Sequence, residues 1–222
     1  MAQDFVVLSA YWGHQAFVPG PERSDPSQGP FNWIDMDVAI DTLCKSPYFS
    51  KLAQYGAGQV FLGNAGHGLA PDEPPSAWSN GTEQDGFTLG DIERFLTREI
   101  DAERLNRPDD WPGVVPIYVV VLQRWLYSKE HFQSAVGEHW RFSYHGAPAN
   151  YAWNIQGASL HDTTKIVSHE IVEAIAMHFG AGEIADDCEH IYGNVGYADR
   201  RVMAQGYKSR EDGDQCRLPG MA

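Results

Sequence analysis

Long apolar runs are missing from this chain of 222 residues: no stretch of 18 or more consecutive apolar residues occurs, so the sequence offers no candidate for a membrane-spanning helix. Basic residues are also scarce, with 16 lysines and arginines against 30 aspartates and glutamates and a formal net charge of −14. Because such a surface repels phosphate groups, we expect neither nucleic acid nor an anionic membrane surface as a partner. The 43% of hydrophobic residues suffices for a sizeable core.

Cysteine is rare as well, with three residues in the whole chain. Cys188 and Cys216 are candidates for a disulfide between two C-terminal segments, and the alternative is that both stay reduced together with Cys44. The first eight residues include an acidic residue and no basic segment, so they predict a strand rather than a signal peptide. We therefore expect a cytoplasmic protein, or a secreted one if a leader has been removed.

Short apolar runs alternate with helical periodicities along the chain. Residues 5–14 and 114–122 each predict a buried strand, and residues 88–105 predict an amphipathic helix. This order predicts an α/β (or α+β) fold with a mixed sheet, and we expect one domain over residues 1–222. The other expected elements are helical segments within 33–55 broken at Pro47, a strand at 59–63, short aromatic strands at 142–146 and 151–155, and long loops at 19–30 and 63–88.

The stretch from Thr163 to Gly180 carries the strongest helix signal. No glycine or proline interrupts it before Gly180, which suits the left-handed residue that ends a helix. Either Asp162 or Thr163 can cap its N-terminus. Apolar residues recur on one face and predict the side that packs on the core, namely Val167, Ile171, Ile175 and Phe179.

This helix contains the pattern His169-Glu170-x-x-Glu173, which resembles the zincin motif with a carboxylate in place of the second histidine. Residues four apart share a helix face, so His169 and Glu173 can bind one cation. Glu170 lies about 100° around the helix, where a general base can take a proton from a water molecule at an open coordination position. The alternative is an amphipathic helix with two solvated glutamates and a partly buried histidine.

The acidic segment after the helix offers a third ligand. The candidates are Glu183, Asp186, Asp187 and His190. Asp186 follows Glu173 by thirteen residues, which is enough for the chain to turn back towards the helix. A set of one histidine and two carboxylates is more anionic than a two-histidine set. We therefore expect zinc, with iron or manganese as competitors.

Two motifs extend along this region: the run from Val167 to Ala174, and Glu183-Ile184-x-Asp186-x-Cys188. Together they resemble the exordium (phosphate-induced protein) family and its bacterial relatives assigned as metallopeptidases, with Ala185 where the family's second motif has glycine. The resemblance implies that Asp186 is the third ligand and that the protein is secreted. Shorter similar segments lie at Tyr11-Trp12-Gly13, Ile117–Val121, Tyr144-His145-Gly146 and from Gln205 to Cys216.

His145 is the candidate for a second catalytic residue. It lies in an aromatic segment upstream of the helix, and its imidazole could donate a hydrogen bond to the oxyanion of a tetrahedral intermediate. The phenols of Tyr144, Tyr151 and Tyr207 could serve the same purpose. The alternative is that Tyr-His-Gly is only a structural turn.

These residues predict a metal-dependent hydrolase, specifically a zinc metallopeptidase with Glu170 as general base, acting on a peptide or a small molecule. One alternative is a metal-dependent enzyme for a small molecule, with the loop at 63–88 closing the pocket. The other is a non-catalytic secreted binding protein, since plant exordium proteins are growth-related extracellular proteins. In that case the His169 cluster would hold a structural ion. The sequence does not predict the oligomeric state.

Overall fold

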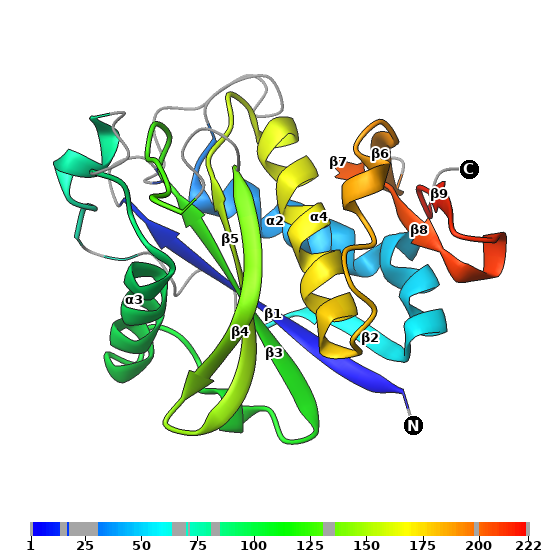
Figure 1. Ribbon diagram of the computed structural model, residues 1–222, viewed down its shortest axis with the longest axis horizontal. Coiled ribbons are helices and arrows are strands. Elements are labelled where there is room, and N and C mark those ends of the chain that lie inside the picture. Colours follow the sequence, from blue (N-terminus) through cyan, green and yellow to red (C-terminus); the bar gives the residue numbers. More distant parts are fainter. Residues whose placement is uncertain are drawn as a thin grey trace.

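A five-stranded sheet organises the computed structural model, which describes residues 2–13, 17, 31–63, 70, 72–80, 85–130, 136–197 and 200–220. The strand order is β2-β1-β3-β5-β4. The first four run parallel to one another, and β4 pairs antiparallel with β5 at the edge. The predicted single α/β domain with a mixed sheet is confirmed (Figure 1). The strands are β1 (Gln3–Trp12), β2 (Ala57–Leu62), β3 (Val114–Leu122), β4 (Gly137–Tyr144) and β5 (Ala147–Ile155).

The central strands β1 and β3 are apolar on both faces because both faces are covered. Along β1, Phe5, Val7 and Tyr11 point to one side, and Val6, Leu8 and Trp12 to the other. The predicted strands at 5–14 and 114–122 are confirmed, although β1 ends at Trp12. His14 and the whole of the expected loop at 19–30 lie outside the described residues.

Helices cover the two faces of the sheet. The helices α2 (Trp33–Lys45) and α4 (Leu160–His178) pack on one face, and α3 (Leu89–Asp101) packs on the other (Figure 1). Helix α2 ends before Pro47, where a break was predicted, and Pro47 begins a 3-10 helix. Helix α3 ends at Asp101 and not at residue 105. The 3-10 helices are η2 (Pro47–Tyr55), η3 (Ser76–Ser79), η4 (Pro108–Asp110), η5 (Asp186–Cys188) and η6 (Arg210–Asp212).

Helix α4 begins earlier than expected. Its N-cap is Ser159, whose hydroxyl accepts a hydrogen bond from the backbone N–H of Asp162. The expectation of Asp162 or Thr163 as the cap is therefore wrong: both lie in the first turn. At the other end Gly180 has the expected left-handed backbone, with φ of 67°. The apolar stripe is confirmed, because Val167, Ile171 and Ile175 are buried and Phe179 packs against the same core.

The C-terminal part forms two hairpins that the sequence analysis missed. These are β6 (Tyr192–Tyr197) with β7 (Arg200–Gln205), and β8 (Tyr207–Ser209) with β9 (Gln215–Arg217). Strand β7 packs along α4, and β6 packs on α2 and η2 (Figure 1). The Cys188–Cys216 disulfide is present and ties η5 to β9, so of the two alternatives for these cysteines the structure has the bridge. Among the described helices, none has the length and apolar composition needed to cross a membrane.

Candidate metal centre

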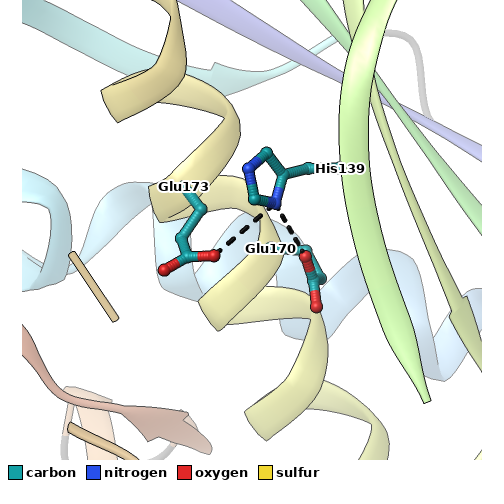
Figure 2. Close-up of side chains that lie close together, drawn as sticks. All are labelled: His139, Glu170 and Glu173. Atoms are coloured by element: carbon teal, nitrogen blue, oxygen red, sulfur yellow. Dashed lines mark hydrogen bonds and ion pairs between the residues drawn. The ribbon is translucent and has the colours of Figure 1, made fainter. Parts of the chain in front are cut away.

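Two imidazoles and four carboxylates meet beside the middle of α4. The helix supplies His169. It also supplies Glu170 and Glu173, which face His139 from the edge strand β4 (Figure 2). The segment after α4 supplies Glu183 and Asp186, which the turn at Gly180 and the disulfide of Cys188 hold near the helix.

The spacing around His169 Nε2 fits a cation better than a hydrogen bond. Glu173 Oε2 lies 3.2 Å from this nitrogen and Asp186 Oδ1 lies 3.3 Å from it. Charge-assisted N–H···O⁻ bonds are shorter, at about 2.7–2.9 Å, and a single N–H cannot point well at two acceptors. Neighbouring ligands of a tetrahedral zinc ion lie roughly 3.3–3.5 Å apart, given bond lengths of about 2.0–2.2 Å. The three groups therefore fit a divalent cation placed between them.

Backbone groups hold Glu173 in place for this role. Its Oε1 accepts hydrogen bonds from the N–H groups of Ala185, at 2.8 Å, and Asp186, at 3.2 Å. One carboxylate oxygen is thus occupied by the turn, and the other faces His169. The turn that donates these hydrogen bonds also carries Asp186. The Glu173 carboxylate therefore links the candidate ligand on α4 to the candidate ligand on η5.

Gln205, from β7, contacts the other side of the His169 ring. Its Nε2 lies 2.7 Å from His169 Nδ1 and donates to the carbonyl of Ala185 at 3.0 Å. Nδ1 accepts this hydrogen bond only in the neutral tautomer with the proton on Nε2, towards the carboxylates, and a ring protonated on both nitrogens requires the Gln205 amide to present its oxygen instead. A cation on Nε2 requires that proton to leave and the Gln205 amide to turn.

His139 connects the two glutamates of the helix. Its Nδ1 lies 3.1 Å from Glu170 Oε2 and 3.6 Å from Glu173 Oε2 (Figure 2). Its Nε2 lies 3.5 Å from Glu183 Oε2. The side chains of His139 and Glu170 are only 9% and 7% exposed. A buried carboxylate with an imidazole donor is held in one position.

Burial and crowding shift the protonation of the cluster. Burial raises the pKa of Glu170 above its ordinary value, and the hydrogen bond from His139 only partly offsets it. A hydrogen bond with Glu173, together with burial, raises the pKa of Glu183 to about 7. Burial lowers the pKa of His169, but the contact with Glu173 and the charges of the nearby carboxylates raise it to about 9. The site therefore attracts positive charge.

A cavity of about 450 Å³ opens onto the cluster. His169, Glu170 and Asp186 line it together with Lys165 and Gly137. Gly137 permits the close approach of β4 to α4, because a Cβ atom at this position would lie 2.7 Å from Glu170 Oε1. A substrate in the cavity would thus contact both the candidate ligands and the candidate base.

The structure brings together four of the five predicted site residues: His169, Glu170, Glu173 and Asp186. It does not place His145 with them. That residue occupies the turn between β4 and β5, has φ of 47°, is 74% exposed and lies 3.9 Å from Asp101. Eight residues of extended chain separate it from Gly137, roughly 26 Å at about 3.3 Å per residue. The catalytic role expected for His145 has no support in this geometry.

Among the rival third ligands, only Glu183 also approaches the cluster, through His139. Asp187 forms an ion pair with Lys208, and His190 is exposed. The sequence analysis missed His139 and Gln205. Both come from strands that reach α4 only through tertiary packing, and the one available signal was the position of His139 in a polar strand beginning at Gly137.

Comparison with known proteins gave no match to a family model, to a curated protein or to a solved structure. The resemblance to the exordium family therefore stays a prediction that depends on the motifs themselves.

Proposed function

We propose that this protein is a metal-dependent peptide hydrolase with a zincin-like site on α4. The observation that carries the proposal is the placement of two carboxylate oxygens, from different segments, at 3.2 and 3.3 Å around one imidazole nitrogen. His169, Glu173 and Asp186 would hold the cation. We propose zinc because the spacing suits a tetrahedral site, while two carboxylates leave iron and manganese as competitors.

A bound divalent cation would supply Lewis acidity for the substrate carbonyl. Side chains of the protein would accept and donate the transferred proton. Glu170 faces the cavity with a raised pKa, so it is suited to take a proton from the attacking water and pass it to the leaving amine. His139 would keep the Glu170 carboxylate oriented through the bond from Nδ1.

The position of β4 favours a peptide over a small molecule. This strand carries His139 and, in the described part of the chain, pairs only with β5, so its outer edge has free backbone groups. An extended peptide can add to such an edge through main-chain hydrogen bonds. Its scissile bond would then lie near the cluster. The Cys188–Cys216 disulfide supports an oxidising compartment, which agrees with the secretion implied by the exordium resemblance.

A peptide library tests the proposal. We expect the zinc-loaded protein to cleave a subset of peptides, as detected by mass spectrometry, and a chelator to abolish cleavage until zinc is restored. The His169→Ala protein, purified in the same way, is the control for a contaminating protease. Failure of the fully loaded protein on the whole library would contradict a peptidase and favour a small-molecule substrate or a structural ion.

A further inference from the structure

We infer that Lys165 binds a carboxylate group of the substrate beside the metal centre. This inference rests on the proposed function and specifies the class of substrate. Lys165 lies four residues before His169, on the same face of α4, and lines the same cavity. Its side chain can therefore meet a substrate group next to the bond that the site would cleave.

Lys165 has no ion-pair partner among the residues that the structure describes. The chain has five lysines, and three of them, Lys45, Lys51 and Lys208, form ion pairs. Across the described residues, no carboxylate lies within 4.0 Å of the Lys165 ammonium, in a protein with 30 acidic residues. A cation left unpaired at the wall of a cavity is available to an anionic ligand.

Its position is nevertheless defined. The ammonium lies 4.5 Å from the centroid of the Tyr192 ring, in a cation–π contact that fixes the side chain at the end of β6. Apolar side chains, Val136 and Ile166, line the same cavity. The cavity is also lined by carboxylates, those of Asp162, Glu170, Asp186 and Glu189, and Lys165 is the one lysine or arginine among its lining residues. A ligand with an apolar side chain and a free carboxylate can therefore place the carboxylate at Lys165 and the apolar group against Val136 and Ile166.

Two kinds of substrate present such a carboxylate. One is a peptide whose last residue enters the cavity, so that the C-terminal carboxylate meets Lys165, and the other is a peptide with an aspartate or glutamate side chain at that position. The spacing of one helical turn between Lys165 and His169 suits the first, because a carboxylate one residue beyond the scissile bond lies only a few ångströms away.

Binding measurements separate these cases without relying on turnover. The zinc-loaded Glu170→Gln protein is titrated calorimetrically with N-acetyl-Leu-Leu, with its C-terminal amide, and with N-acetyl-Leu-Asp-amide. We expect the free acid to bind at least tenfold more tightly than the amide. The Lys165→Met change should remove this difference, and Lys129→Met, at an exposed lysine outside the cavity, should preserve it.

Every other result of the titration either supports or contradicts the inference. Tight, Lys165-dependent binding of the aspartate peptide alone would keep the carboxylate recognition and assign it to a side chain. Equal affinity for acid and amide, or a preference that survives Lys165→Met, would overturn the inference while leaving the hydrolase proposal intact if wild-type protein cleaves the library. A protein that binds no zinc would contradict both.

Discussion

Strand β4 has a histidine near each end, His139 within the strand and His145 in the turn that follows it, and only His139 belongs to the candidate site. At the N-terminal end, His139 is 9% exposed and contacts three glutamates. At the C-terminal end, His145 is 74% exposed and has one distant carboxylate neighbour, Asp101. The residue type is the same, so the difference lies in what packs against each end. Helix α4 packs against β4 at the first end, whereas His145 at the second contacts the Tyr144 ring and Asp101 at the end of α3.

The largest expected effect concerns the carboxylate that His139 holds. The Glu170→Gln change keeps the shape of the side chain but removes the base, so turnover should fall by roughly 10²–10⁴-fold while zinc remains bound. Steady-state hydrolysis of a cleaved library peptide, with zinc content measured on the same sample, tests this. Full activity of this variant would show that Glu170 is not the base.

The pH dependence of zinc binding is the next largest effect. Because the pKa of His169 is raised to about 9, its protonated form stabilises the metal-free protein below about pH 6.5, and this stabilisation is lost as the pH rises through 9. A cation must displace that proton. Zinc affinity should therefore rise about tenfold per pH unit between about 6.5 and 9, as measured by competition with a chelator. A flat profile would mean that His169 is not a ligand.

Exchanging the two histidines for alanine compares the ends of β4 directly. His139→Ala should reduce kcat by about 10–100-fold with a smaller effect on KM, because Glu170 loses its oriented donor. His145→Ala should stay within about twofold of wild type, since its ring lies outside the cluster. If both variants lost kcat to a similar extent at equal thermal stability, His139 would have no role in the reaction that His145 lacks.

Substitutions at the glycines near the two histidines compare the same two ends of β4, and their expected effects on kcat and stability are smaller. Gly137→Ala places a Cβ 2.7 Å from Glu170 Oε1 and should displace the base, lowering kcat several-fold. Gly146→Ala meets no atom within 4 Å but has φ of 90°, so it should cost about 1 kcal/mol of unfolding free energy and leave kcat unchanged. Chemical denaturation and kinetics of both variants test the pair, and the reverse pattern would contradict it.

Local signals in the sequence account for much of the fold. Strands β1 and β3 and helix α4 were predictable because apolar runs and helix periodicity reflect burial directly. The C-terminal hairpins were not, because their short, mixed strands are stabilised by packing on α4 and by the disulfide. The cap at Ser159 was missed because Asp162 and Thr163, which follow within four residues, are also good capping residues.

The residues of the candidate site also fall into those that the sequence predicts and those that it does not. The helix spacing of His169, Glu170 and Glu173 was predictable from one segment, and Asp186 from the acidic turn that follows. His139 was not, because its role depends on the antiparallel edge strand lying across α4. His145 was favoured through its aromatic neighbours, but Tyr144 donates to Asp101 and holds that turn away from the helix.

The most direct test of the central claim is a zinc titration of the metal-free protein beside its His169→Ala and Asp186→Ala variants. We expect the folded wild type to bind one equivalent with a clear rise in Tm, and both variants to lose this binding while remaining folded. A folded wild type that binds no divalent cation, or an Asp186→Ala protein that binds zinc as tightly as wild type, would contradict the proposed centre.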